Sequence, residues 1–154
     1  MKFILISLFL FVALSFINTS HAEADQQFIA KFKNAVALKD KSKFMALIHK
    51  DGALDQALSG YNTLLEGLFS AGELVYRIED PSPEAVYTFE RGGVTYTTNL
   101  SVTKVLFIED PTVEPNSGKF STYEFLLGVI DGKFYITTTT IKNPNKAVKS
   151  TTGS

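Results

Sequence analysis

Residues 120–141 read FSTYEFLLGVIDGKFYITTTTI and decide the fold of this chain. Two runs of β-branched and aromatic residues flank Asp131-Gly132, a dipeptide that readily supplies the two positive-φ positions of a type I′ turn. The stretch is the strongest β-hairpin signal in the sequence. We therefore expect the remaining elements to cover this hairpin or to extend it into a sheet.

The beginning of the chain predicts an export signal. A positive Met1-Lys2 start precedes the apolar run Phe3–Ile17, and a short polar stretch then ends on the small residue Ala22. This layout is that of a secretory signal peptide at residues 1–22. The apolar run is shorter than the about 20 residues of a membrane-spanning helix. We therefore expect a soluble protein, periplasmic or secreted, that has no membrane contact after cleavage.

Composition narrows the protein class further. Cysteine is absent, so neither disulfides nor a lipidated cysteine can stabilise or anchor the chain. The formal net charge is −1 with scattered charges, whereas a nucleic-acid partner normally requires a basic face. The length suits one ordinary domain. We expect that domain at residues 23–141 and a polar, flexible tail at residues 142–154.

The first half of the chain predicts three helices. Apolar residues recur at helical spacing from Phe28 onward. A short second helix is expected to end near Gly52, and a third helix to stop at Gly72. Gly60 and Gly67 lie inside the third helix, which suggests a close approach to another backbone or a bend.

The second half predicts strands, because the apolar period changes from 3.6 to 2 after Glu73. Arg91-Gly92-Gly93 marks a second hairpin, and one long strand is expected from Val94 to Ile108. A change in its apolar pattern near Thr103-Lys104 suggests a bulge or bend there. A loop at residues 110–118 precedes the closing hairpin. The fold class is therefore α+β, with three N-terminal helices packed on a curved, mostly antiparallel sheet of four to five strands.

One known superfamily resembles this pattern. The segment FKNAVALKDKSKFMALIHKDG at residues 32–52 and the closing VIDGKFYI at residues 129–136 are similar to the nuclear-transport-factor-2-like superfamily, part of the cystatin-like group. The resemblance implies a cone-shaped fold over about residues 25–141. The superfamily includes isomerases, dehydratases, cyclases, transport adaptors and exported domains, so the resemblance alone does not select a function.

Few residues support catalysis. The enzymes of that superfamily place an Asp, His or Tyr inside the cone, and His49 is the only histidine after the predicted signal peptide. His49 is expected at a helix end, where a solvent-facing role is the simpler interpretation. Glu66 lies between apolar positions of the third helix and is the other weak candidate, as a base. No metal site and no cofactor are predicted. With one histidine and no cysteine, a zinc site would have to be built mostly from carboxylates, which are poor zinc ligands.

The aromatic content suggests binding instead. Five tyrosines fall on predicted helix or inward-facing strand positions, and they could line the mouth of the cone around a small apolar ligand. Ordinary core packing explains them equally well. These predicted ligand-binding residues are Tyr61, Tyr76, Tyr96, Tyr123 and Tyr135.

The resulting functional hypothesis is an exported, non-enzymatic domain that binds a small apolar ligand or a protein partner. The row Thr137–Thr140 would suit a homodimer through the sheet, or a solvated outer face. Two alternatives stay open. One is a small cofactor-independent lyase or isomerase with an acid/base residue in the cone. The other is a periplasmic inhibitor or immunity-type protein that uses the loop at residues 110–118.

Overall fold

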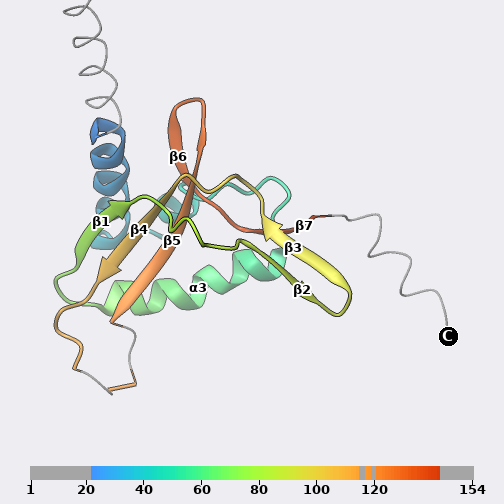
Figure 1. Ribbon diagram of the computed structural model, residues 1–154. Helices are drawn as coiled ribbons and strands as arrows, with labels where there is room; N and C mark the ends of the chain where they lie inside the picture. Colours follow the sequence, from blue (N-terminus) through green and yellow to red (C-terminus); the bar gives the residue numbers. More distant parts are fainter. Residues whose placement is uncertain (1–21, 115–116, 119–120, 143–154) are drawn as a thin grey trace, which may run out of the picture.

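A computed structural model describes residues 22–114, 117–118 and 121–142 of the chain (Figure 1). The predicted signal peptide, apart from Ala22, and all of the predicted tail but Lys142 lie outside these residues. The described part is α+β, with three helices packed on antiparallel sheets of four and three strands. The helices cover residues 22–37, Lys41–Met45 (α2) and Asp55–Ser70 (α3). The strands are β1 Val75–Glu79, β2 Thr88–Arg91, β3 Val94–Thr98, β4 Lys104–Glu109, β5 Thr122–Ile130, β6 Lys133–Ile136 and β7 Thr139–Ile141.

The closing hairpin forms as predicted. β5 and β6 pair antiparallel from Leu127↔Ile136 to Ile130↔Lys133. Their two-residue turn has positive φ at both central positions, 49° at Asp131 and 72° at Gly132, which is the requirement of a type I′ turn. The hairpin is one side of the four-stranded sheet, whose order is β1-β4-β5-β6.

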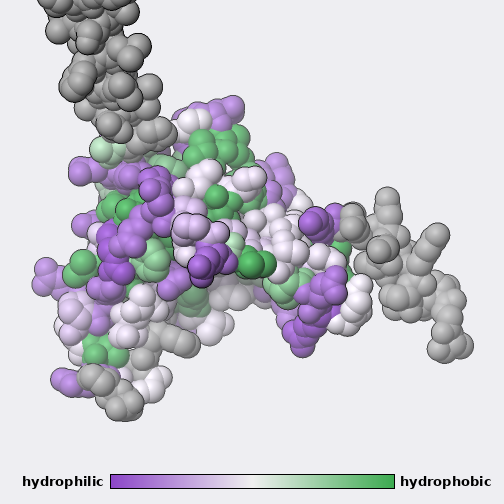
Figure 2. Space-filling model, viewed as in Figure 1, coloured by the Kyte–Doolittle hydropathy of each residue, from purple (hydrophilic) through white to green (hydrophobic). Residues whose placement is uncertain are grey.

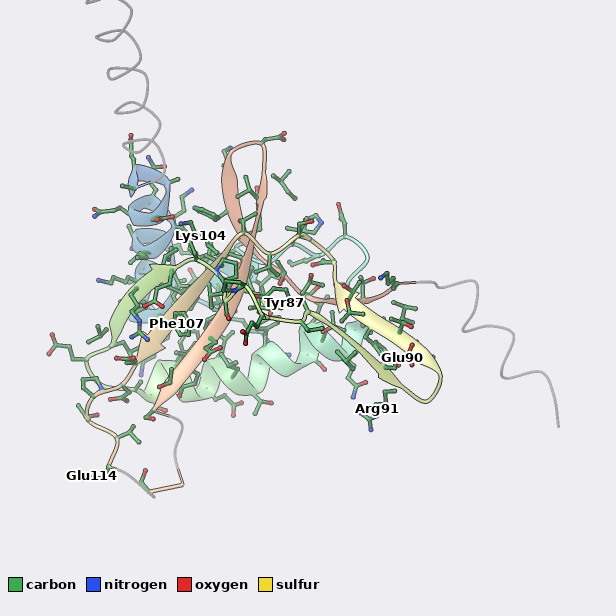
Figure 3. The ribbon with its side chains drawn as sticks, in the orientation of Figure 1. Tyr87, Glu90, Arg91, Lys104, Phe107 and Glu114 are labelled. Atoms are coloured by element: carbon green, nitrogen blue, oxygen red, sulfur yellow. The ribbon has the colours of Figure 1, made fainter. Side chains whose placement is uncertain are left out.

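A second hairpin forms an arm beside this sheet. β2 and β3 pair around Gly92 and Gly93, whose φ angles are 59° and 75°. β7 pairs with β3 and completes a three-stranded sheet of order β2-β3-β7. In Figure 3, Glu90 and Arg91 lie on this arm, well away from Lys104 and Phe107 on the larger sheet.

The prediction of one sheet with four to five strands was wrong, because the chain breaks two of the expected strands. The expected strand from Val94 to Ile108 is interrupted at residues 99–103. That segment crosses β5 so closely that a Cβ on Gly128 would lie 2.6 Å from Leu100 Cβ. The Thr row is interrupted too, because β6 ends at Ile136 and β7 begins at Thr139. Seven shorter strands in two sheets are the result.

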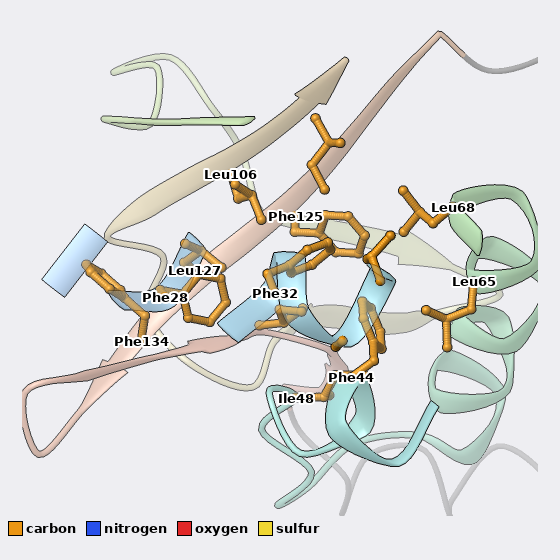
Figure 4. Close-up of a cluster of buried hydrophobic side chains, with 14 residues drawn as sticks. Phe28, Phe32, Phe44, Ile48, Leu65, Leu68, Leu106, Phe125, Leu127 and Phe134 are labelled. Carbon is orange, nitrogen blue, oxygen red and sulfur yellow. The ribbon is translucent and has the colours of Figure 1, made fainter. Parts of the chain in front are cut away.

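The helices and the inner face of the larger sheet share one core (Figure 4). Phe32 is its centre, with ring centroids 5.3 Å from Phe44 and 5.2 Å from Phe125. Leu65 and Leu68 bring α3 into the same cluster. The sheet face that carries Phe125 is therefore filled by side chains from all three helices.

The second helix is shorter than expected. α2 ends at Met45, whereas the sequence predicts a helix to about Gly52. The chain leaves the helix because Ile48 forms a parallel bridge with Ile136 at the edge of β6. The His49 N–H donates to the Ile136 carbonyl at 2.9 Å, and the Ile136 N–H donates to the Leu47 carbonyl at 2.8 Å. Sheet hydrogen bonds thus replace the last helical turn.

No helix within the described residues is both long and apolar enough to cross a membrane.

Candidate functional site

A groove of about 620 Å³ lies between the first helix, α2 and the β5–β6 hairpin. We call it the lysine groove. Its volume is within the about 300–1,000 Å³ that is typical of small-molecule sites. The hairpin projects upward in Figure 2 and carries both hydrophobic and hydrophilic atoms. The described lining residues are Ala24, Gln27, Phe28, Ala30, Lys31, Asn34, Lys43, Ala46, Leu47, Gly132, Lys133, Phe134 and Tyr135.

The floor of the lysine groove is apolar. Phe28 comes from the first helix and Phe134 from β6, and their rings meet edge to face with centroids 6.2 Å apart. Both side chains are buried, and Leu47 adds a half-buried aliphatic group. Phe28 belongs to the apolar stripe of its helix, and Phe134 faces inward by strand alternation. The core of the protein thus continues into the groove.

The lining also carries three exposed lysines, one from each element: Lys31, Lys43 and Lys133. Lys43 Nζ lies 3.5 Å from Asn34 Oδ1 and 3.7 Å from Asp40 Oδ2. The Lys43–Asp40 pair is half exposed, and such pairs contribute about 0.2–1 kcal/mol. No Asp or Glu is among the described lining residues, so the groove combines an apolar floor with a positive rim.

Tyr135 is the one predicted ligand-binding tyrosine that lines this groove. Its ring centroid lies 6.4 Å from that of His49, with the ring planes at 65°. His49 is half-buried, and its main chain is held by the bridge to β6, not by a helix end. This ring contact joins the first half of the chain to the hairpin.

Tyr61 is a packing residue of the core. Its ring stacks on Phe125 with centroids 6.3 Å apart and an interplanar angle of 14°. Its hydroxyl donates to the Thr137 carbonyl at 2.9 Å. Burial raises the pKa of Tyr61 to about 12. The phenol is therefore neutral at physiological pH and links α3 to the segment after β6.

The other three tyrosines lie at separate places. Tyr76 on β1 packs edge to face on Phe32 and has Lys33 Nζ 4.9 Å from its ring centroid. Tyr96 on β3 stacks on Phe89 in the arm, with centroids 5.1 Å apart. Tyr123 on β5 reaches α3. The structure therefore does not bring the five tyrosines together at one mouth.

Tyr123 lines a second cavity, of about 440 Å³, at the other end of α3. Burial, followed by the charge of Asp110, raises the pKa of the Tyr123 phenol. Asp110 is buried, and its Oδ1 accepts hydrogen bonds from the Thr112 N–H at 3.0 Å and the Thr112 hydroxyl at 2.6 Å. These bonds hold the start of the loop that follows β4.

The two weak catalytic candidates do not form a site. Glu66 is exposed on α3, whereas a base with a raised pKa would have to be buried in the apolar interior. His49 lies elsewhere, on the segment that bridges to β6. Within the described part of the chain, no three His, Asp or Glu side chains are grouped as metal ligands would be.

The sequence analysis did not identify the lysines of the groove as candidate binding residues. Gln27, Lys31 and Asn34 recur at i, i+4 and i+7, so they form a polar stripe beside the apolar stripe of Phe28 and Phe32. The stripe itself was visible in the sequence. Its meeting with Lys133 was not, because nothing local places the hairpin against the first helix.

We compared the chain with models of known protein families, with curated proteins and with solved structures, and none of the three comparisons found a match.

Proposed function

We propose that this protein is an exported, non-enzymatic domain that binds a small amphipathic anion, an apolar chain with a carboxylate or similar head group, in the lysine groove. The observation that carries the proposal is the combination of an apolar floor with three lysines and no described acidic residue. Lys43 already pairs with Asp40, but a neutral apolar ligand would leave Lys31 and Lys133 without a role. An anionic head group would use them, because opposite charges attract across a partly shielded groove.

The geometry suggests how such a ligand lies. Its apolar chain covers Phe28 and Phe134, where each buried CH₂ contributes about 0.8 kcal/mol. Its head group lies at the rim beside Lys31 and Lys133, which belong to different elements. Tyr135 provides an amphipathic wall between the two. No chemical step is required of any of these residues.

The proposal also includes the predictions made from the sequence about export, the cone-shaped fold and the oligomeric state. Export rests on the signal-peptide pattern at residues 1–22. The cystatin-like cone rests on the order of the elements and on the closing hairpin. A homodimer through the Thr row is less favoured by the packing, because Thr137 and Thr138 are buried within the chain and offer no flat outer face. Size-exclusion chromatography with light scattering measures the oligomeric state directly.

The test is calorimetric titration of the domain at residues 23–154 with decanoate and with decanol, which share an apolar chain and differ in charge. We expect decanoate to bind more tightly, and its affinity to fall as salt is raised. The double variant Lys31→Gln/Lys133→Gln should weaken decanoate binding about five-fold, the effect of about 1 kcal/mol. Decanol binding should not change.

Lys41→Gln is the matched control. Lys41 is also an exposed lysine, and it lies on α2, but it does not line the groove. The Lys41→Gln substitution should leave decanoate binding unchanged. Equal affinity for decanoate and decanol, or equal losses in both lysine variants, would show that the groove does not select an anion. The absence of any binding to either compound would reject the groove as the site.

A further inference from the structure

A cavity of about 300 Å³ lies apart from the lysine groove, between α3, the first half of β5 and the link from β6 to β7. It exists because β6 pairs only with residues 127–130 of β5. After Ile136 the chain turns toward β3, so residues 122–126 of β5 have no neighbouring strand on that side. We call this space the β5 cavity.

Two buried hydroxyl groups line the β5 cavity. Thr137 and Thr138 are each 4% exposed, and neither Oγ1 has a hydrogen-bond partner among the described residues. Their main chain is fully bonded. Thr137 donates to the Leu126 carbonyl and accepts from Tyr61, while Thr138 exchanges two hydrogen bonds with Asn99. A buried hydroxyl without a partner is unfavourable, and here two such groups lie within the wall of one cavity, where only a shift of the wall would expose them.

The open edge of β5 also presents main-chain N–H and C=O groups to the β5 cavity. The Leu127 carbonyl accepts from the Thr103 N–H on the β4 side, and the Leu126 carbonyl accepts from the Thr137 N–H on the opposite side. Backbone groups of an antiparallel strand alternate between its two sides. The N–H and C=O of Glu124 therefore point toward the β5 cavity, where no described residue hydrogen-bonds to them.

We propose that the β5 cavity binds a short extended peptide segment, which adds as a strand beside residues 122–125, up to the Leu126 carbonyl that Thr137 already occupies. One peptide residue pairs its N–H and C=O with those of Glu124. A small shift of the cavity wall on binding brings the buried Thr137 and Thr138 hydroxyls to the adjoining peptide groups. Strand addition to an open sheet edge is a recurrent mode of peptide recognition. The exposed Glu124 carboxylate at the rim favours a basic side chain on the peptide.

A sugar or polyol fits the cavity less well. Sugar sites commonly offer a free aromatic face, but Tyr61 already stacks on Phe125 inside the core. The alternating N–H and C=O of a strand edge match a peptide main chain more closely than a ring of hydroxyl groups. The proposal concerns a different surface from the lysine groove, so either can fail without the other.

The experiment is an NMR titration of the ¹⁵N-labelled domain with the blocked peptide acetyl-Thr-Val-Lys-Val-amide. We expect the Glu124 amide signal to shift and its hydrogen exchange to slow at least ten-fold on binding. The Phe125 amide is the internal control, because it faces β4 and should change little. A second peptide of the same sequence, N-methylated at all four residues, keeps the side chains but loses the main-chain donors of both edges. It should not bind.

Two variants test the hydroxyl groups. Thr137→Val and Thr138→Val keep the side-chain shape and should each weaken peptide binding several-fold, whereas Thr140→Val, outside the cavity, should not. If a valine variant does not fold, the two peptides compared on the unchanged protein still decide the question. Equal binding of the N-methylated peptide, an unchanged Glu124 amide, or valine variants that bind normally would overturn the proposal.

Discussion

At the scale of single residues, Tyr61 shows how one side chain combines packing with a specific polar contact. It stacks on Phe125 and donates a hydrogen bond to the Thr137 carbonyl. The sequence placed it on the apolar face of a helix. The partner on the far side of the core could not be found from the sequence, because residues 61 and 137 meet only after the sheet folds over α3.

We predict a pH-dependent effect of Tyr61→Phe on the free energy of unfolding. The folded pKa of about 12 exceeds the ordinary value of 10, so folding keeps the proton that the unfolded chain loses. This contribution is complete below pH 10 and is lost as the pH rises toward 12, at about 1.4 kcal/mol per pH unit. Loss of the hydrogen bond should cost about 1 kcal/mol at pH 8.

Urea denaturation of the parent protein and the Tyr61→Phe variant, at pH 8 and between pH 10 and 11.5, measures this effect on the free energy of unfolding. The stability advantage of the parent protein over the phenylalanine variant should shrink or reverse above pH 10. The free energy of unfolding of the variant is subtracted from that of the parent at each pH. This difference isolates Tyr61, because Tyr76 and Tyr123 also have pKa values raised by burial and titrate in both proteins. A difference that stays constant with pH would mean that the Tyr61 phenol titrates normally.

At the scale of elements, α3 contains two glycines with different surroundings. The sequence suggested a close approach to another backbone, or a bend. A Cβ on Gly67 would lie 3.0 Å from the Tyr123 hydroxyl oxygen, which is a close approach of a side chain from β5. Nothing lies within 4 Å of a Cβ on Gly60. The close approach at Gly67 therefore comes from a side chain and not from another backbone, and Gly60 has no close neighbour.

We predict different effects of the two alanine substitutions on the free energy of unfolding. Gly60→Ala should stabilise the protein by about 0.5–1 kcal/mol, because alanine favours the helix and the site is open. Gly67→Ala should gain less than that or lose stability, because Tyr123 must move by a few tenths of an ångström. Thermal or urea unfolding gives both values. Equal stabilisation by the two substitutions would show that Tyr123 yields without cost.

At the scale of the whole molecule, the two sheets differ in how they are buried. The four-stranded sheet contributes Leu106, Ile108, Phe125, Leu127 and Ile136 to the core, each 2% exposed or less. The three-stranded sheet of the arm contributes no buried residue from β2, β3 or β7. Small sheets without a packed face are marginal in water.

Native-state hydrogen exchange should reflect this difference. Amides of β4 and β5 are expected to exchange only through opening at or near the global free energy of unfolding, whereas those of β2 and β3 should exchange through a smaller, local opening. NMR-detected hydrogen exchange at several denaturant concentrations distinguishes global opening from local opening. If the arm is protected as strongly as β4, another surface must cover it in solution, and the oligomeric state becomes the next measurement.

Local chemistry explains what the sequence by itself determined. Both hairpins were predictable because Asp131-Gly132 and Gly92-Gly93 supply positive φ within two residues. The helix that carries Phe28 and Phe32 was predictable because one apolar stripe at 3.6-residue spacing must be buried. These signals need no knowledge of distant segments, and they establish the α+β class.

Only the tertiary structure decided where strands break and where sites form. The chain leaves its strand at residues 99–103 because that segment must pass over Gly128, and it leaves α2 early because Ile48 pairs with Ile136. Both contacts join residues far apart in sequence. The lysine groove and the β5 cavity have the same origin. Each is the space left when separate elements pack together, and no local pattern of residues encodes that space.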